Sequence, residues 1–503
     1  MDRTRLPLLL AGLLAACSLE PAYQRPAAPV PPAFPTGPAY QTTPAGANGK
    51  GNGANVSGAP GQSAADIGWQ DFFVDARLKQ LIELALANNR DLRMTALSID
   101  AARAAYRIRR AAQFPAINAT AGETTQHLPS DVRLPGQASV VSQFDAGIGF
   151  NAFELDFFGR VRSLKHDALE QYLATEEAHR SAQISLVAEV ANAYLTFQAD
   201  QALLKLSQDT LNGQQQSVEV VQRSMRAGAL AQLDLNRAST QVDTAQVAVE
   251  QYTRQVAKDE NALALLIGGP VPPSAIAANA PDGQRMLADL PGGLPSDLLL
   301  HRPDIIAAEH QLKAANANIG AARAAFFPTI SLTGQLGLAS ATLAGLFSAG
   351  TAAWLFSPQI SLPIFNAGSN RANLDLANVR KDINIANYEK TIQTAFREVA
   401  DGLASRGTLD RQVKAQEKLV EHTQETYHLS QMRFRAGIDD YFAEQDAQRS
   451  LFTAQQALVT LRLARETNQV SLYKALGGGW TKTTQAPQGQ QGPQGQTPPI
   501  ARK

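Results

Sequence analysis

Residues 324–338 read AAFFPTISLTGQLGL, and after the proline apolar residues alternate with polar or small ones. Alternation at period two places the apolar side chains on one face of an extended strand. A second alternating stretch runs over 354–364, and no charged residue occurs anywhere in 324–370. Uncharged, alternating strands of about ten residues are typical of a transmembrane β-barrel. We therefore expect strands near 328–338 and 354–364.

The beginning of this stretch occurs twice in the chain. Residues 111–117, AAQFPAI, match 324–330, AAFFPTI, and the two prolines are 328 − 115 = 213 residues apart. Three further pairs follow in the same order at an offset of 209: Glu189-Val190-Ala191 with Glu398-Val399-Ala400, Arg226-Ala227-Gly228 with Arg435-Ala436-Gly437, and Ile267-Gly268-Gly269 with Leu476-Gly477-Gly478. We expect an internal duplication, with repeats at 66–270 and 296–480 and a linker at 271–295. The first repeat has weaker strand signals, near 115–121 and 145–155.

Long proline-free stretches predict helices in each repeat. None of the 27 prolines lies in 136–269 or 364–486, and a proline inside a helix costs about 3 kcal/mol. We expect a helix of about 68 residues between Gly159 and the turn at 226–228, and a second helix returning to about residue 267. The alternative is a solenoid of several shorter helices, broken at Gly213.

The N-terminus has the features of a secretory signal. Eleven uncharged residues, 6–16, follow Arg3 and Arg5, and Cys17 comes next in the sequence Leu14-Ala15-Ala16-Cys17. The run is too short to cross a bilayer but suits a signal peptide, and its end resembles a bacterial lipobox. We expect a signal peptide at 1–16 and a covalent lipid on Cys17; the alternative is an ordinary signal peptide with a chance cysteine. Residues 17–65, rich in Pro, Gly and Ala, are expected to form a tether along the body, and 481–503 a disordered Gln/Pro/Gly tail.

Two strands from each repeat give only four strands. Four strands cannot close a membrane barrel, and an open edge in lipid leaves backbone groups unpaired. A homotrimer would supply twelve strands, enough for a barrel with an aqueous pore. A rival reading takes 338–356 as a transmembrane helix, but its Gly, Ser and Thr content is high and the flanking residues alternate at period two.

Composition and motifs argue against several classes of function. Equal numbers of basic and acidic side chains, 45 each, argue against a nucleic-acid partner. A single cysteine excludes an internal disulfide and a Cys-rich metal site. The seven histidines lack metal-ligand spacing, and HExxH, GxSxG, GxGxxG and Walker motifs do not occur. We expect no enzyme, no catalytic or metal-binding residues, and no cofactor apart from the lipid on Cys17.

Acidic residues and one phenylalanine follow the two predicted hairpin turns: Asp234, Asp439, Asp440, Phe442 and Asp446. In a trimer each acidic position would form a ring, which favours cations and repels anions. Phe442 and Asp446 are four residues apart and can share one helical face. We interpret these five residues as a periplasmic gate. The alternative is that the acids are ordinary first-turn residues, favoured by the helix dipole.

Several motifs between residue 17 and residue 480 resemble those of one family: Cys17 in its lipobox, Gly68-Trp69-Gln70-Asp71-Phe72-Phe73, Leu294-Pro295-Ser296-Asp297-Leu298-Leu299, His301-Arg302-Pro303-Asp304, Phe327-Pro328, Phe365-Asn366-Ala367-Gly368 and Asp446-Ala447-Gln448-Arg449. The chain resembles the outer-membrane factor family, the TolC-like channels of tripartite efflux systems, and especially its lipoprotein branch of OprM- and NodT-type proteins.

The resemblance implies a mixed α/β membrane protein. Its fold would be a TolC-like trimer with a twelve-stranded barrel in the outer membrane of a Gram-negative bacterium and a long periplasmic α-helical barrel. It also implies an adaptor protein docking at the hairpin turns, for which we name Arg226, Gly228, Arg435 and Gly437, and an inner-membrane pump of the RND type. In OprM-like members a Leu and an Asp constrict the closed pore; their counterparts would be Phe442 and Asp446, with Phe in place of Leu.

The expected function is passive conduction of drugs or other small solutes handed over by the pump. Three alternatives remain: the conduit of a type I protein-secretion system, a periplasmic adaptor lipoprotein, and a lipoprotein enzyme or solute-binding protein. An adaptor would have one hairpin within β-rich halves rather than a twofold repeat. The enzyme or binding protein would need a compact α/β pattern with a polar site.

Overall fold

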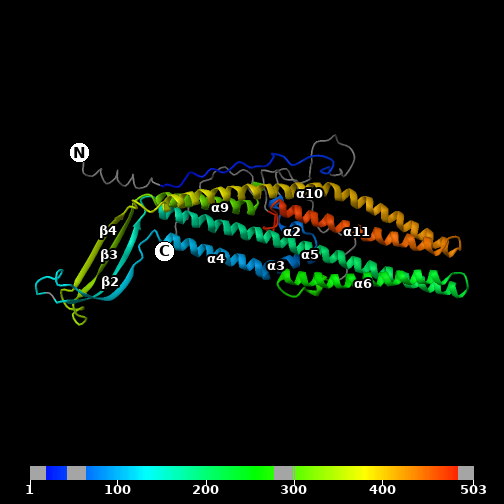
Figure 1. Ribbon diagram of the computed structural model, residues 1–503. Coiled ribbons are helices and arrows are strands. Elements are labelled where there is room, and N and C mark those ends of the chain that lie inside the picture. The colour runs from blue at the N-terminus through cyan, green and yellow to red at the C-terminus, as the bar shows by residue number, and fades with distance from the viewer. Residues whose placement is uncertain (1–17, 42–63, 137, 277–297, 300, 485–503) are drawn as a thin grey trace, which may run out of the picture. The chain divides into compact units, whose positions relative to one another are not determined.

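The computed structural model describes residues 18–41, 64–136, 138–276, 298–299 and 301–484 (Figure 1). The expected signal peptide, Cys17 and most of the inter-repeat linker lie outside these residues. The described chain divides into two units. The first contains 18–27, 97–176 and 307–390, and the second contains 28–96, 177–306 and 391–484.

The first unit is built around one four-stranded antiparallel sheet. Its strands are β1 (Asn118–His127), β2 (Val140–Leu155), β3 (Thr329–Ser340) and β4 (Ala352–Ser361), in the order β1-β2-β3-β4. The two strand pairs of the duplicated sequence are thus joined through β2 and β3. The stretch 338–356 contains the end of β3, a loop and the start of β4, so the alternative of a transmembrane helix is wrong.

Three of the four strands have an end that differs by three residues or more from the expected one. β1 begins three residues later than expected and continues to His127, while β2 begins at Val140 rather than near 145. Pairing explains both shifts, because β1 and β2 are in register from Asn118↔Gly149 to His127↔Val140. β4 ends at Ser361, three residues before the predicted end.

Glycines allow the two central strands to approach closely. A Cβ on Gly149 would lie 2.3 Å from the carbonyl oxygen of Gly334, and one on Gly337 would lie 2.3 Å from that of Ala146. A side chain at either position would force the strands apart. A bulge lies between Phe150 and Phe153, where β2 changes register against β3.

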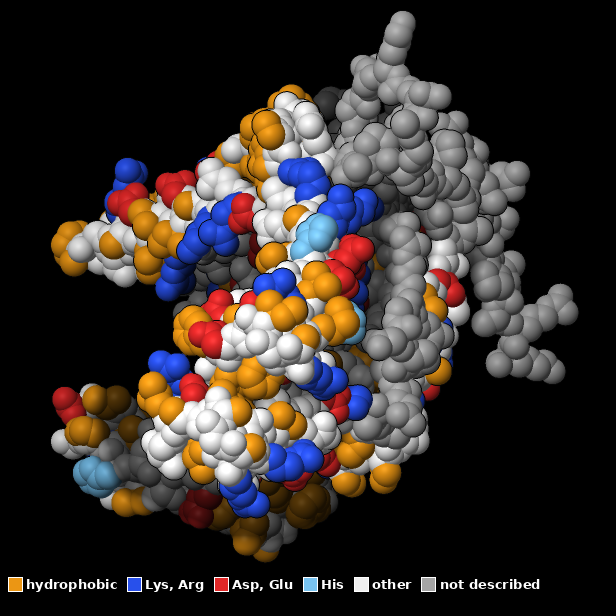
Figure 2. Space-filling view, turned by 90° about the vertical axis from the view of Figure 1, so that its right-hand side faces the viewer, with side chains coloured by type: hydrophobic (Ala, Val, Ile, Leu, Met, Phe, Trp, Pro, Cys, Tyr) orange, Lys and Arg blue, Asp and Glu red, His pale blue; other side chains and the backbone are white. Residues whose placement is uncertain are grey.

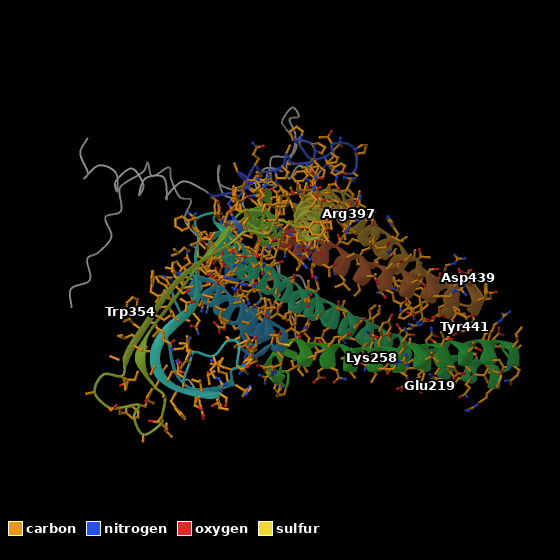
Figure 3. All side chains as sticks on the ribbon, turned by 60° about the vertical axis from the view of Figure 1, so that its left-hand side comes forward. Glu219, Lys258, Trp354, Arg397, Asp439 and Tyr441 are labelled. Carbon is orange, nitrogen blue, oxygen red and sulfur yellow. The ribbon has the colours of Figure 1, made fainter. Side chains whose placement is uncertain are left out.

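Large apolar side chains of the sheet remain on the surface of the single chain. Trp354 is 78 % exposed and is labelled on the sheet in Figure 3. Leu336 and Ile360 are exposed to 70 % and 69 %. Hydrophobic side chains also lie among charged ones on the surface seen in Figure 2. Apolar area of this extent indicates contact with a partner or with lipid.

The helices repeat the same pattern in both halves of the sequence. α4 (Arg90–Ala111) precedes β1 and α9 (Pro303–Ala324) precedes β3, while α5 (Arg160–Arg226) and α10 (Ser369–Arg435) each contain 67 residues. α6 (Gln232–Ile267) and α11 (Tyr441–Ala475) return from the turns. α5 continues through Gly213, so the predicted long helix is confirmed and the broken solenoid is wrong.

None of the helices within the described residues has both the length and the apolar character needed to cross a membrane.

The core of the second unit surrounds an aromatic cluster near α2 (Trp69–Phe72) and α3 (Ala76–Asn88). The ring of Tyr473 stacks on Phe72 with centroids 4.0 Å apart and meets the edge of Phe73 at 6.2 Å. Tyr194 is fully buried and donates from its hydroxyl to Asp75 Oδ2 over 2.8 Å. The aromatic residues at 69–73 therefore fix the start of the body against the long helices.

Both terminal segments of the second unit are held by backbone contacts. Thr481 and Lys482 accept hydrogen bonds from the backbone N–H groups of Trp69 and Gln70. The expectation of disorder from residue 481 is therefore wrong for 481–484, because backbone pairing orders a segment that lacks an apolar face. At the other end of the chain, Arg411 donates to the carbonyl oxygens of Pro38 and Gln41 over 3.0 and 2.7 Å.

A buried arginine joins three segments of the second unit. Arg302 is 7 % exposed and forms ion pairs with Asp304 and Glu398 at 2.5 and 2.8 Å. It also donates to the carbonyl oxygen of Ala475 over 3.0 Å. Asp304 in turn accepts from the N–H of Ile305, and both residues lie in the first turn of α9. The sequence His301-Arg302-Pro303-Asp304 thus has a structural role in the packing of the helix ends.

We expect Arg302→Met to lower the free energy of unfolding by about 2–3 kcal/mol, because it leaves two carboxylates and a carbonyl without their donor. Arg462→Met is the matched control: its ion pair with Glu417 is about half exposed on both sides, so its loss costs less than about 1 kcal/mol. Thermal unfolding in detergent measures both. Equal midpoints for the two variants would contradict the role of Arg302.

Candidate functional site at the hairpin turns

The two hairpin turns, both in the second unit, have the same backbone geometry. At the end of α5, Ala229 N–H donates to Ser224 and Gly228 N–H to Met225; at the end of α10, Ile438 N–H donates to Arg433 and Gly437 N–H to Phe434. Gly228 and Gly437 are left-handed, with φ of 76° and 68°. This is the Schellman arrangement, in which a glycine allows the chain to reverse at a helix end. The sequence match between the turns therefore reflects a shared structural requirement, and Arg226 and Arg435 remain exposed beside it.

Three of the five predicted gate residues stabilise their own hairpin. Asp234 accepts from the N–H of Ala231 over 3.1 Å, and Asp440 accepts from that of Ala443 over 3.2 Å. Both therefore cap the helices that follow the turns. Asp439 pairs with Arg433 at 2.6 Å, and this hydrogen bond lowers the pKa of its carboxyl. These contacts fit the alternative interpretation, in which the acids belong to the local structure of the turns.

Phe442 and Asp446 lie in a different environment, on one wall of a groove between α10 and α11. The groove has a volume of about 470 Å³, and its α10 side consists of Thr423, Thr426 and Ser430. Phe442 is 54 % exposed, and the guanidinium of Arg237 lies 5.8 Å from the centre of its ring. Asp446 pairs with Arg449 one turn along α11 and is half exposed. Phe442 and Asp446 share one helical face, as expected. The ion pairs of Asp234 and Asp446 are formed with arginines of their own helices, Arg237 and Arg449.

The two hairpins contact each other through Tyr441. This residue begins α11, is 3 % exposed, and packs with Val221 of α5 and Ala238 of α6. Burial raises the pKa of its hydroxyl to about 12. Figure 3 shows Tyr441 and Asp439 near the α10–α11 turn. The turn of the second repeat is therefore anchored on the first repeat just beside Phe442.

Sequence reasoning missed a buried carboxylate in the same turn. Glu444 is 5 % exposed, and burial raises its pKa, although Gln431 donates to it and Arg435 lies nearby. Glu444 in turn contributes to a raised pKa of Tyr427, which is caused mainly by burial. The signal available in the sequence was its position three residues after Tyr441 and seven before Leu451, two apolar residues that share its face of α11 and are buried.

Sequence reasoning also missed a pair of carboxylates between α5 and α6, Asp200 and Asp259. Asp259 is 9 % exposed and accepts from Gln255 over 3.0 Å. Burial, together with a hydrogen bond to Asp259, raises the pKa of Asp200 to about 6. Within the described residues, no group of three or more His, Cys, Asp and Glu side chains is arranged to hold a metal ion.

We expect Glu444→Gln to flatten the pH dependence of stability. Because the folded state raises the pKa of Glu444, the folded protein holds this proton more tightly than the unfolded chain. Its contribution is therefore complete at low pH and is lost as pH rises through the folded pKa. Unfolding midpoints measured from pH 4.5 to 7.5 should fall less in Glu444→Gln than in the unsubstituted protein. Glu417→Gln, at an exposed position of α10, should leave the profile unchanged; a change of the same size in both would refute the assignment.

Comparisons with known proteins agree with this architecture. A family model described as outer membrane efflux protein matches residues 81–269 and 294–478. The chain is 51 % identical over 474 residues to the antibiotic efflux pump outer membrane protein ArpC of Pseudomonas putida, and equally to the toluene efflux pump outer membrane protein TtgC of the same species. Each alignment covers 94 % of this chain and 95 % of the relative.

A solved structure shows the same fold. The open state of the MtrE outer membrane channel of Neisseria gonorrhoeae superposes with a TM-score of 0.81 at 37 % identity, covering 93 % of this chain and all of the other. The two matched segments of the family model coincide with the two repeats of helices and strands described above. The chain belongs to the outer membrane efflux protein family and has the TolC-like fold of outer-membrane channels.

Proposed function

We propose that the protein is the outer-membrane channel of a tripartite efflux system and works as a homotrimer. The observation that carries this proposal is the four-stranded sheet, whose outer strands β1 and β4 are its edges within the described chain. Three copies would supply twelve strands and remove every edge, as a membrane requires. The same assembly would bring together the exposed apolar side chains of neighbouring helices, such as Met94, Ile108 and Leu265.

The transported compounds are small solutes that pass through a water-filled tunnel without further chemistry. The relatives are named for efflux of antibiotics and of toluene, which supports drugs and small apolar compounds as the substrate class. Energy would come from an inner-membrane pump of the RND type, with a periplasmic adaptor between pump and channel. A type I protein-secretion conduit is the alternative from the same structural class, and the naming of the relatives favours efflux.

The hairpin turns are the proposed contact for the adaptor. Arg226 and Arg435 are exposed beside the left-handed glycines Gly228 and Gly437. Opening would require the hairpins to move apart under the influence of a partner that binds the open state more tightly. Tyr441 and the groove with Phe442 and Asp446 lie at the position where such a movement would act.

Covalent lipid on Cys17 would anchor the chain to the outer membrane. Within the first unit Arg25 pairs with Glu309 of α9, and within the second unit Pro38 and Gln41 accept from Arg411 of α10. Because several acyl chains bind a membrane far more stably than one, we expect the lipidated protein to remain membrane-bound in high salt.

Single-channel recording in a planar bilayer tests the function and the gate together. Discrete openings of trimeric protein are expected, and Asp446→Asn should open more often. One exposed contact is worth up to about 1 kcal/mol, so the loss of three such contacts in a trimer should raise the open probability by up to on the order of a hundredfold. Asp209→Asn is the control, because Asp209 is 61 % exposed on α5 and pairs with Lys205 outside the groove.

The variants separate the possible outcomes. Openings with equal frequency in Asp446→Asn and Asp209→Asn would exclude Asp446 from the gate while leaving the channel function intact. Phe442→Leu, which restores the residue typical of OprM-like members, should change the conductance of the resting state if the ring lies in the constriction. Folded trimers that never open in any variant would overturn the proposed function.

A further inference from the structure

Two consecutive residues of α6, Arg237 and Ala238, contact the beginning of α11. Tyr441 packs on Ala238 in a buried cluster, and Gln445 donates from Nε2 to the carbonyl oxygen of Arg237 over 3.4 Å. Because Tyr441 and Gln445 are four residues apart, they lie on the same face of α11. The start of the second-repeat hairpin is therefore held on the first repeat at these two residues of α6.

The side chain of Arg237 extends this contact to Phe442. Its guanidinium carbon lies 5.8 Å from the centre of the Phe442 ring, within the distance of about 6 Å over which a cation is attracted by the negative face of an aromatic ring. The ring is 54 % exposed and also lines the groove of about 470 Å³ between α10 and α11. A residue of the first repeat thus contacts a wall of the groove that belongs to the second repeat.

Asp234 orients the guanidinium from the start of α6. Its Oδ1 lies 3.9 Å from Nη1 of Arg237, one turn along the helix, and its Oδ2 accepts from the N–H of Ala231 over 3.1 Å. The carboxylate is therefore fixed by the helix start while it faces the arginine. An arginine whose direction is already set loses less conformational freedom when it binds an aromatic ring.

We propose that Arg237 is a positioning residue of the channel gate: its cation–π contact holds the Phe442 ring, and with it the first turn of α11, on the first repeat while the channel is closed. This inference rests on the proposed function, since a closed state exists only in a channel. Movement of the hairpins apart takes α11 away from α6 and breaks the contact. A leucine at position 442 has no ring face and could not make it, so Phe442 and Arg237 act as a pair.

Loss of the charge of Arg237 should therefore favour the open state. A cation–π contact at an exposed site changes an equilibrium by a factor of about two to five, and three such contacts in a trimer that opens as one unit change it by about tenfold to a hundredfold. We expect Arg237→Gln to raise the open probability of trimers in a planar bilayer by this factor. Arg254→Gln removes an exposed arginine further along α6 and should leave the open probability unchanged.

A double substitution separates the contact with Phe442 from the ion pair with Asp234. In Phe442→Leu the ring is absent but the ion pair remains, and an exposed ion pair within one helix contributes little. Arg237→Gln should therefore change the open probability of Phe442→Leu by less than about twofold. If the effects of the two single substitutions simply multiply in the double variant, the pairing of Arg237 with Phe442 is overturned.

Fluorinated phenylalanines at position 442 test the ring without altering the arginine. Analogues with one, two and three ring fluorines draw electron density progressively away from the ring face and so weaken its attraction for a cation. The open probability should rise at each step of the series in the chain with Arg237 and stay constant along the series in Arg237→Gln. The fluorine NMR resonance of the singly fluorinated protein should shift in Arg237→Gln and stay in place in Arg254→Gln, and this measurement needs no conductance.

The gating role of Arg237 is overturned if the open probability is the same along the fluorinated series, or if Arg237→Gln and Arg254→Gln behave alike. A fluorine resonance that does not respond to Arg237→Gln overturns the contact itself. Folded trimers that never open would overturn the channel function and the gating role with it, whereas a resonance that depends on Arg237 would still establish the contact between α6 and α11. The contact and the channel function can therefore fail separately.

Discussion

Backbone hydrogen bonding at the two edges of the four-stranded sheet constrains the rest of the structure. A strand edge in hydrocarbon leaves N–H and C=O groups unpaired at several kcal/mol each, and even in water such an edge promotes aggregation. β1 and β4 form these edges in one chain, and exposed side chains such as Trp354 and Ile360 extend the same problem to the sheet face. In the proposed trimer, closure of the barrel solves both problems. Each edge strand pairs with a strand of a neighbouring copy, and the apolar side chains of the sheet face lipid. The long helices, which also expose apolar side chains, would then pack side by side as a closed helical barrel that continues the β-barrel.

The helical part of this fold can be predicted from the sequence because its determinants are local. Exclusion of proline over more than a hundred residues and the offset of 209 between matching turns define α5, α6, α10 and α11 almost to their ends. The strands are harder to predict from the sequence. β1 is exposed along its whole length and contains Glu123 and His127, so it lacks a clear apolar face. Its limits follow from pairing with β2, which the alternation of side chains does not reveal. Pairing with residues 69 and 70 likewise orders 481–484, whose composition alone indicates disorder.

Some features of the hairpin turns can likewise be predicted from local sequence, whereas others depend on contacts between distant residues. Asp234 and Asp440 are recognisable as helix caps by their distance from a glycine turn, and the spacing of Phe442 and Asp446 predicts their common groove. Glu444, by contrast, is buried because Tyr441 of the same turn packs on the first repeat, a contact across more than two hundred residues. The N-terminal segment 18–27 is a stronger example: the contacting residues Glu20 and His166 are 146 positions apart, and Tyr23 and Glu309 are 286 apart. These contacts cannot be inferred from residue types along the chain.

The equal length of α5 and α10 has a consequence for how such chains can vary. One inserted residue in a helix moves everything beyond it by about 1.5 Å and rotates it by about 100°. An insertion in only one of the two long helices would displace Tyr441 from its contacts with Val221 and Ala238. It would also turn the helix-capping acids Asp234 or Asp440 to another face of the hairpin. Insertions and deletions in the helices are therefore tolerated only as compensated sets, matched between α5 and α10. Single changes of length belong in the loop between β3 and β4, where they leave the register of the hairpins unchanged.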